Sequence, residues 1–397
     1  MVWRVSATEL ERRQRQIRDE LGRRELEGLC LFSSTHIYYL TGFAFIQTER
    51  PIGLAFPRSG RSVLFLPRLE EEHAHEHARV DEIEAYAEYP GRVHPMRRFA
   101  EICGDLGLAA AAVGIDSDGY GGGYGYQGPK LSELLPEARV TPTRAMLEDM
   151  IMIKSAEEVA FIRESAKWGN LAHTLLQQYT RPGLNETEVS ERASFEATQA
   201  MIRALGPTYR PLSWMRSGAH AGYRGQVGRD SAIPHSLTTN AVFQAGDVLV
   251  TGAGASIAGY GSELERTMII GSTDDKQRRY FALMVGAQDT AFAAIRPGAR
   301  CCDVDQAVMR FFESHDLMAH WRHHTGHALG MGIHEAPFFD VGDTTQIQPG
   351  MVFSVEPGIY VAGYAGFRHS DTVLVTEDGI ESLTYYPRLL EQLTIRV

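Results

Sequence analysis

The order of apolar and polar positions divides the first part of the chain into short alternating helices and strands. Residues 7–26 carry apolar side chains at helical spacing among dense charges, which is the pattern of an amphipathic helix. Short apolar runs at 28–32, 62–67 and 110–116 are bounded by glycine, proline and polar residues, and this predicts buried strands. The alternation of helices and strands predicts an α/β domain over residues 1–150.

A second block, residues 151–397, opens with a long amphipathic helix. Ser155 and Glu158 stand three positions apart at its start and form the pattern of a capping box. We interpret residues 247–270 as a β-hairpin whose turn is AGYG. Strand and turn signals continue to residues 372–384. The second block therefore mixes helices and strands, and the expected fold class of the whole chain is α/β (α+β).

The second block also contains an internal repeat. The tripeptide Arg-Pro-Gly follows a helical segment at 181–183 and again at 296–298, and in both copies a valine stands six residues after the glycine. Arg-Pro-Gly is also a common helix stop, so the tripeptide alone would indicate nothing more. An amphipathic helix follows in both copies. The matched helices favour two halves packed about a pseudo-twofold axis, with a site between them.

Composition and charge restrict the classes of protein and partner. A chain of 397 residues exceeds most single hydrophobic cores, and two domains are expected. The net charge is −11 without a stripe of lysine or arginine, which argues against nucleic acid as a partner. No apolar run is long enough to span a membrane, and the start has no apolar signal core. The four cysteines include no C-x-x-C pair, and we expect a cytoplasmic protein.

Four segments of the second block carry acidic or imidazole side chains. They are AIPHSLTTN around His235, SELERT with Glu263 and Glu265, HHTGHALGMGIHEAP with His327 and His334, and SVEPGIY followed by FRHSDTVLVTEDG. Their order and wording resemble the creatinase/aminopeptidase P/prolidase superfamily, whose catalytic fold is called pita-bread. The resemblance extends over the whole chain. It implies an amino-terminal α/β domain, a carboxy-terminal pita-bread domain with its site in a cleft, and a homodimer.

In peptidases of that superfamily two metal ions are held by two aspartates, a histidine and two glutamates. The resemblance places Glu263, His327 and Glu356 at three of these positions. Gly252 and Ser370 stand at the first aspartate and the last glutamate. Because a metal pair needs bridging carboxylates to offset its charge, we expect no cofactor. The alternative is one divalent ion, manganese, iron or zinc, on Glu263, His327 and Glu356.

The creatinase branch of the superfamily works without a metal, and its corresponding segment also ends in L-E-R-T. The resemblance makes Glu265 and Glu356 carboxylates that bind a cationic substrate group, and it makes His235 a proton shuttle, a task that suits imidazole at neutral pH. The segment after His334 lacks the arginine with which creatinase binds its substrate carboxylate. The candidate residues are thus His235, His327, His334 and Glu356 for catalysis and Glu263, Glu265 and Arg368 for substrate binding.

Three functions remain open from these residues. The first is metal-independent, histidine-mediated hydrolysis of a C–N bond in a small cationic or amide/amidine substrate. The second is a metal-dependent Xaa-Pro aminopeptidase or dipeptidase with a one-metal site, and the third is a peptide-binding protein without catalysis. We also expect the loop with Trp214, Arg216 and Arg224 to close over the substrate. We expect His323 and His324 to lie outside the pocket, or one of them near its rim.

Overall fold

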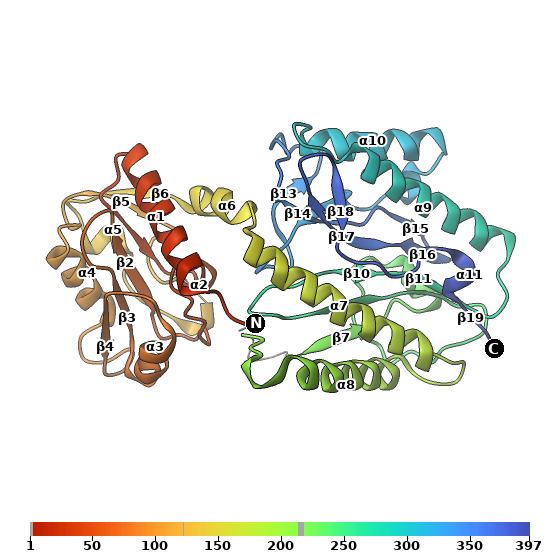
Figure 1. Cartoon of the computed structure of the whole chain (residues 1–397), viewed down its shortest axis with the longest axis horizontal. Coiled ribbons are helices and arrows are strands. Elements are labelled where there is room, and N and C mark those ends of the chain that lie inside the picture. Colours follow the sequence, from red (N-terminus) through yellow and green to blue (C-terminus); the bar gives the residue numbers. More distant parts are fainter. Residues whose placement is uncertain (1–2, 122, 213–217) are drawn as a thin grey trace. The chain divides into compact units, whose positions relative to one another are not determined.

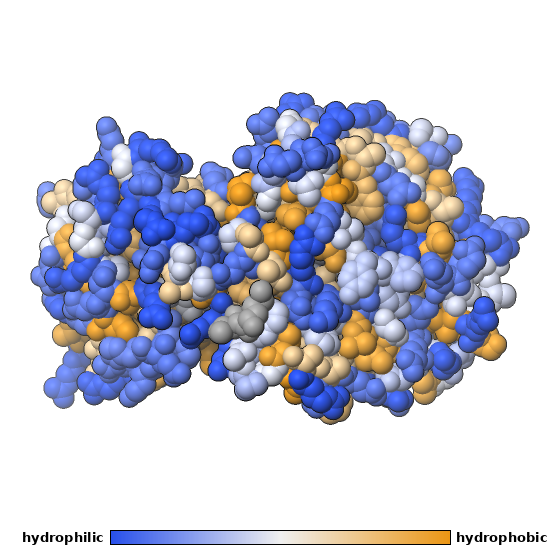
Figure 2. All heavy atoms as spheres, in the orientation of Figure 1, coloured by the Kyte–Doolittle hydropathy of each residue, from blue (hydrophilic) through white to orange (hydrophobic). Residues whose placement is uncertain are grey.

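The computed structural model describes residues 3–121, 123–212 and 218–397. The chain divides into two compact units, Val5–Ile151 and Met152–Val397 together with the described residues 3–4, which we refer to as the amino-terminal and the carboxy-terminal domain (Figure 1). Hydrophilic side chains cover much of the face drawn in Figure 2. No helix in the described ranges has both the length and the apolar content needed to cross a lipid bilayer.

The amino-terminal domain is built around a six-stranded sheet in the order β4-β3-β2-β1-β5-β6. Strands β1, β5 and β6 run parallel, as do β3 and β4, whereas β2 is antiparallel to both of its neighbours. The strands are β1 (Gly28–Leu31), β2 (Gly53–Pro57), β3 (Val63–Pro67), β4 (Glu82–Tyr86), β5 (Ala112–Ile115) and β6 (Arg139–Pro142). The helices are α1 (Ala7–Arg23), α2 (Ser34–Thr41), α3 (Glu71–His77), α4 (Pro95–Asp105), α5 (Leu131–Leu134) and α6 (Arg144–Met152).

The carboxy-terminal domain contains an eight-stranded sheet in the order β13-β12-β14-β17-β10-β9-β7, with β18 paired to β17. A three-stranded sheet β19-β11-β8 and a two-stranded sheet β15-β16 accompany it. The strands are β7 (Ala219–Gly222), β8 (Val248–Val250), β9 (Gly252–Ala255), β10 (Leu264–Glu265), β11 (Thr267–Ile270), β12 (Gly326–Ala328), β13 (Glu335–Phe339), β14 (Val352–Val355), β15 (Gly358–Val361), β16 (Ala365–Arg368), β17 (Ser370–Val375), β18 (Ile380–Ser382) and β19 (Thr394–Ile395). The helices are α7 (Ala156–Tyr179), α8 (Glu186–Leu205), α9 (Asp275–Ala294), α10 (Cys301–Ser314) and α11 (Leu390–Leu393).

The first helix of each domain begins at a side-chain cap. Ser6 accepts a hydrogen bond from the backbone N–H of Glu9 at the start of α1. Ser155 and Glu158 form the predicted capping box at the start of α7. Such caps bind backbone N–H groups that the first helical turn leaves without partners. They fix where each helix enters its domain.

Two helical hairpins, α7–α8 and α9–α10, confirm the duplication that the Arg-Pro-Gly repeat predicts. Gly183 and Gly298 both adopt left-handed backbone, with φ of +87° and +86°, which glycine reaches without steric cost. Each donates its N–H over 2.9 Å to a carbonyl oxygen, that of Phe243 in the first copy and that of Ile347 in the second. In Figure 1, α8 and α10 lie at opposite edges of the domain with strands between them. Two matched halves therefore flank the sheet that carries the candidate residues.

Residues 247–270 form the predicted hairpin. Ala258 and Gly259 make its turn with φ of +52° and +80°, and two left-handed residues suit the twist of a tight hairpin. The strands next to the turn, β9 and β10, pair in the eight-stranded sheet, whereas the outer strands β8 and β11 pair in the three-stranded sheet. One hairpin thus contributes to two sheets.

The hairpin bends where its strands pass from one sheet to the other. At the bend, the Thr251 hydroxyl accepts the backbone N–H of Arg266 over 3.0 Å. β10 contains only Leu264 and Glu265, and Glu263 stands directly before it. The fully buried guanidinium of Arg266 pairs with Asp371 over 2.7 Å and donates to four backbone carbonyl oxygens, those of Glu265, Ser370, Tyr386 and Pro387.

We expect Arg266→Met to destabilise the carboxy-terminal domain by about 3–5 kcal/mol, because Asp371 would remain as a buried charge without its cation. The measurement is the free energy of unfolding in urea. Arg278→Met is the matched control, since Arg278 pairs with Asp275 at a side-chain exposure of 51%; its cost should stay within about 0.5 kcal/mol. Equal losses in the two variants would contradict an anchoring role for Arg266.

Candidate functional site

Three side chains in or next to strands of the eight-stranded sheet converge at one point. Glu263 precedes β10, His327 lies in β12 and Glu356 follows β14. One ligand atom from each lies within 4.8 Å of the others. His327 Nε2 is 3.2 Å from Glu356 Oε1 and 4.0 Å from Glu263 Oε2. Two carboxylates and an imidazole are a donor set that catalytic divalent metal ions accept.

The orientation of His327 tests whether these residues fit a metal ion. Its Nδ1 donates to the carbonyl oxygen of Ala328 over 3.1 Å, so the lone pair of the neutral ring lies on Nε2. That nitrogen is buried and faces both carboxylates, at 3.2 Å from Glu356 Oε1 and 4.0 Å from Glu263 Oε2. Because the lone pair of a neutral ring would be repelled by these negative charges, the arrangement requires either a proton or a metal ion between the three groups. The donor set therefore fits a metal ion.

Close packing of the carboxylates shifts the pKa values of all three groups. Burial, followed by repulsion from Glu356 and Glu265, raises the pKa of Glu263 to about 7. Burial alone would lower the pKa of His327, but Glu356 and Glu263 raise it to about 9. Burial would raise the pKa of Glu356, yet His327 and Arg368 hold it well below its usual range. The cluster therefore retains protons at neutral pH, and a cation would compete with them for the same atoms.

Two serines orient the carboxylate of Glu263. The hydroxyl groups of Ser354 and Ser370 each lie 3.0 Å from Glu263 Oε1 and hydrogen-bond to it, which leaves Oε2 toward the imidazole. At position 370 the resemblance would place a carboxylate ligand, whereas this chain has a hydroxyl that supports another ligand. Asp371, the next residue of β17, turns to the opposite side and pairs with Arg266, as strand alternation requires.

Glu265 is almost completely buried and is bound by two arginines of its own chain. Arg368 contacts both of its oxygens, with Nη2 2.7 Å from Oε1 and Nε close to Oε2, and Arg224 Nη2 lies 2.6 Å from Oε1. Arg368 Nε also lies 3.7 Å from Glu356 Oε2. The carboxylate that the sequence assigns to a cationic substrate group is thus already paired with positive charge. A Cβ atom at Gly252 would lie 3.6 Å from Glu265 Oε1, so Glu265 borders the space of the missing side chain.

Sequence reasoning missed two supports of the site. Tyr360 accepts a hydrogen bond from Arg368 Nη1 over 3.0 Å, and its hydroxyl lies 2.8 Å from His323 Nε2. His323, which the sequence placed outside the pocket or near its rim, is thereby connected to the site through Tyr360. Ser354 stands two positions before Glu356, and the period of a strand was a signal that could have placed both side chains on one face. Nothing in the sequence pattern indicated the contact with Tyr360.

The structure describes His334 and His235, the two other histidines expected in catalysis, but not the whole loop expected to close over the substrate. The ring of His334 stacks on that of His327, with centroids 3.7 Å apart and 19° between the planes. Partial burial and the nearby charges of His327 and His235 lower the pKa of His334, so its imidazole is neutral at pH 7. His235 lies in an exposed turn. Trp214 and Arg216 lie outside the described residues.

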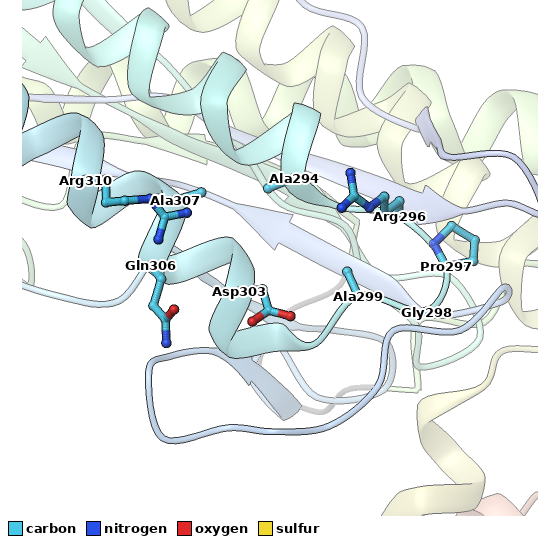
Figure 3. Close-up of a pocket in the computed structure, with 9 residues that line it drawn as sticks. All are labelled: Ala294, Arg296, Pro297, Gly298, Ala299, Asp303, Gln306, Ala307 and Arg310. Carbon is cyan, nitrogen blue, oxygen red and sulfur yellow. The ribbon is translucent and has the colours of Figure 1, made fainter.

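A hollow of about 740 Å³ lies elsewhere in the same domain, between the end of α9 and α10 (Figure 3). Arg296, Asp303 and Arg310 are among its lining residues. The converging carboxylates and imidazole take no part in lining it. The candidate site is therefore defined by its donor atoms and not by this hollow.

Comparison with known proteins identifies the class. Residues 160–377 match the family model "Metallopeptidase family M24", and residues 13–153 match "Creatinase/Prolidase N-terminal domain". Because the first match covers more than half of the chain, the chain belongs to metallopeptidase family M24. It is a hydrolase of the creatinase/Xaa-Pro peptidase superfamily. The resemblance stated from the sequence and the predicted fold class are confirmed.

Several similar proteins match this chain along nearly their whole length. The chain is 25% identical over 381 residues to a Xaa-Pro dipeptidase of Pyrococcus horikoshii, covering 95% of this chain and 97% of that one. It is 29% identical over 371 residues to the probable dipeptidase PepE of Mycobacterium tuberculosis, covering 92% of each. The crystal structure of dipeptidase PepE from Mycobacterium ulcerans superimposes with a TM-score of 0.81 at 26% identity, over 99% of this chain and 100% of that one. A Xaa-Pro dipeptidase from Bacillus anthracis gives 0.78 at 25% identity, over 97% and 99%.

These findings correct the expectation that the enzyme uses no cofactor. That expectation is wrong, because the family is one of metallopeptidases and the relatives are dipeptidases and prolidases of it. The metal-independent creatinase mechanism is likewise not supported. The expectation rested on the carboxylates missing at Gly252 and Ser370. The remaining residues Glu263, His327 and Glu356 nevertheless bring three ligand atoms together, which is enough to bind one metal ion.

We expect His327→Ala to weaken the binding of Mn²⁺ by more than the 10- to 100-fold that loss of an outer partner of a metal ligand typically costs. Calorimetric titration of chelator-treated protein with Mn²⁺ measures this change. His315→Ala, which alters an exposed histidine at the end of α10, is the control and should leave the affinity unchanged. If both variants bind Mn²⁺ like the unmodified protein, His327 is not a ligand.

Proposed function

We propose that the protein is a metal-dependent dipeptidase that hydrolyses the C–N bond of Xaa-Pro dipeptides. The ion would be manganese, iron or zinc, bound by Glu263, His327 and Glu356. The observation that carries the proposal is the convergence of their three donor atoms within 4.8 Å, with the buried Nε2 of His327 facing both carboxylates. The names of the relatives, Xaa-Pro dipeptidase and prolidase, support the substrate class.

The donor set favours one ion over two. Gly252 has no side chain that could bind a metal ion, and the Ser370 hydroxyl already donates a hydrogen bond to Glu263 Oε1 over 3.0 Å. The positive charge of the buried Arg368 offsets Glu265, the carboxylate that borders the space at Gly252. A second divalent ion beside a buried guanidinium would meet repulsion without added carboxylates to offset it.

The chain's own residues would orient the peptide and transfer protons. When bound, the ion supplies a Lewis acid that polarises the scissile carbonyl group and lowers the pKa of a water molecule. His334, neutral at pH 7 and stacked on His327, would donate a hydrogen bond to the substrate carbonyl oxygen. His235 would act as the general acid that donates a proton to the leaving nitrogen. The serines that hold Glu263 Oε1 keep that carboxylate from rotating away from the reacting atoms.

Several assignments stay predictions. They are the location in the cytoplasm, the homodimer and the division of the chain into residues 1–150 and 151–397. A peptide-binding protein without catalysis is disfavoured, because the chain belongs to a family of peptidases.

The direct test is the release of proline from Ala-Pro before and after removal of metal. We expect chelator-treated protein to retain less than about 1% of the activity, because the three ligands alone supply no Lewis acid. About one equivalent of Mn²⁺, Fe²⁺ or Zn²⁺ per chain should restore it. Elemental analysis of the active protein gives the stoichiometry. Full activity without metal would overturn the proposal, and a requirement for two ions per chain would overturn its one-ion form.

We expect His334→Ala and His235→Ala each to lower kcat for Ala-Pro by about 100- to 10,000-fold, the range typical of lost acid–base groups. Neither residue belongs to the converging donor set, so bound metal and the thermal midpoint should stay unchanged. His315→Ala again serves as the control. A variant that keeps its full kcat removes that histidine from the mechanism.

A further inference from the structure

His235 lies in a loop whose two ends meet. The loop runs from Gly225 to Thr239, and we refer to residues 225–239 as the His235 loop. A Cβ atom at Gly225 would lie only 2.0 Å from the carbonyl oxygen of Leu237, so the end of the loop packs directly against its beginning. The φ of Gly225 is +77°, which glycine reaches without steric cost. Compact loops with adjoining ends are frequently functional.

One buried carboxylate joins the two ends of the His235 loop. Glu186 belongs to the first turn of α8 and is 1% exposed. Its Oε2 accepts the backbone N–H of Gly225 over 2.7 Å. Its Oε1 accepts the backbone N–H of Thr239 over 2.7 Å and the Thr239 hydroxyl over 3.2 Å, and the N–H of Ala241 lies 3.4 Å away. A single side chain therefore closes the loop.

The four partners of Glu186 are three backbone N–H groups and one hydroxyl, and none of them is a cation. A buried carboxylate is costly unless hydrogen bonds satisfy it, and bonds to a charged acceptor are stronger than bonds between neutral groups. A glutamine offers one oxygen, and its amino group would face N–H donors at the other end of the loop. The closed loop therefore needs both oxygens of a carboxylate.

The middle of the His235 loop is fixed as well. The hydroxyl of the fully buried Ser231 accepts the backbone N–H of Gly366 in β16 over 2.9 Å. Within the loop, Gln226 Nε2 donates to the carbonyl oxygen of Ile233 over 3.2 Å, two positions before His235. The exposed imidazole of His235 thus stands on backbone that is held on both sides, although its own side chain faces solvent.

The loop brings His235 within electrostatic reach of the imidazole of His334. We propose that Glu186 is a positioning residue, whose carboxylate keeps the His235 loop closed and thereby holds His235 at the reacting atoms. The proposal rests on the proposed function, because it takes His235 as the general acid for the leaving nitrogen. Glu186 itself touches no reacting atom and acts through His235.

Steady-state hydrolysis of Ala-Pro by metal-loaded Glu186→Gln tests the proposal. We expect kcat to fall about 10- to 100-fold, as misplacement of a catalytic group by about 1 Å permits, while KM and the bound metal stay unchanged. Glu188→Gln is the matched control, because Glu188 is exposed in the same first turn of α8. It loses the same favourable charge at the helix N-terminus and should keep the full kcat.

A double-mutant cycle with His235→Ala separates positioning from a general structural role. In that background we expect Glu186→Gln to change kcat by less than about twofold, because a residue that acts only through His235 has nothing left to position. A residue that supports the fold in general would add its full loss in both backgrounds.

Amide hydrogen exchange reports on the loop without any substrate. We expect the N–H groups of Gly225 and Thr239 to exchange about 10- to 100-fold faster in Glu186→Gln, as loss of hydrogen bonds to a charged group permits, and to stay unchanged in Glu188→Gln. Thr239→Val removes only the hydroxyl contact of an exposed residue and should show a smaller change in the same direction. It decides the outcome if Glu186→Gln does not fold.

Unchanged exchange in the His235 loop of Glu186→Gln overturns the proposal. Full kcat in that variant, or an equal loss of kcat with and without His235, overturns it too. If the protein hydrolyses Ala-Pro with no metal, the proposed function fails, and faster exchange in Glu186→Gln would still show that this carboxylate closes the loop. Active protein whose loop exchange ignores the substitution would leave the proposed function standing and remove Glu186 from it.

Discussion

Repulsion among three closely packed carboxylates is the constraint on which the site depends. Glu263, Glu265 and Glu356 are largely or fully withdrawn from water, where like charges interact strongly and each needs an opposite charge nearby. The chain meets this need unevenly. Glu265 contacts two guanidinium groups, whereas Glu263 and Glu356 share the imidazole of His327, and Glu356 also lies 3.7 Å from Arg368 Nε. Glu265 is therefore paired within the chain, whereas the carboxylates that face His327 are where the proposed metal ion would add positive charge.

The bent hairpin of residues 247–270 places Glu263 and Glu265, and with them their two sets of partners, next to each other. Its bend at Thr251 and Arg266 moves the outer strands into a second sheet. Arg266 pairs with Asp371 on one side of the strand layer. Ser370, the residue before Asp371, donates a hydrogen bond to Glu263 on the other side. Because side chains alternate along a strand, Asp371 joins the ion pair with Arg266 on one face, and Ser370 contacts the candidate site on the other. The ion pair at Arg266 holds the strands on which the reactive groups depend.

Position 252 is where this chain departs from the ligand pattern that its sequence resembles. Where the superfamily's peptidases place a carboxylate at position 252, this chain has glycine, and the neighbouring space is bordered by Glu265 and Arg224. Arg224 and Arg368 both contact Glu265, and Arg368 also lies 3.7 Å from Glu356 Oε2, so two guanidinium groups face two carboxylates at this edge of the site. Family membership indicates the type of reaction, whereas substrate choice depends on the individual side chains of the site.

The sequence by itself determined the elements and the family. The Ser155–Glu158 cap, the repeated Arg-Pro-Gly stops and the AGYG turn are local signals, read over a few residues, and the structure contains each of them. Motif order gave the superfamily and the identity of His327 and Glu356 as neighbours. Only the tertiary structure decided the partners of Glu265, since Arg224 and Arg368 lie 41 and 103 positions from it in the chain. Charge balance at a buried site is a property of distances in space, and for that reason counting ligands along the sequence led to the wrong conclusion about the metal.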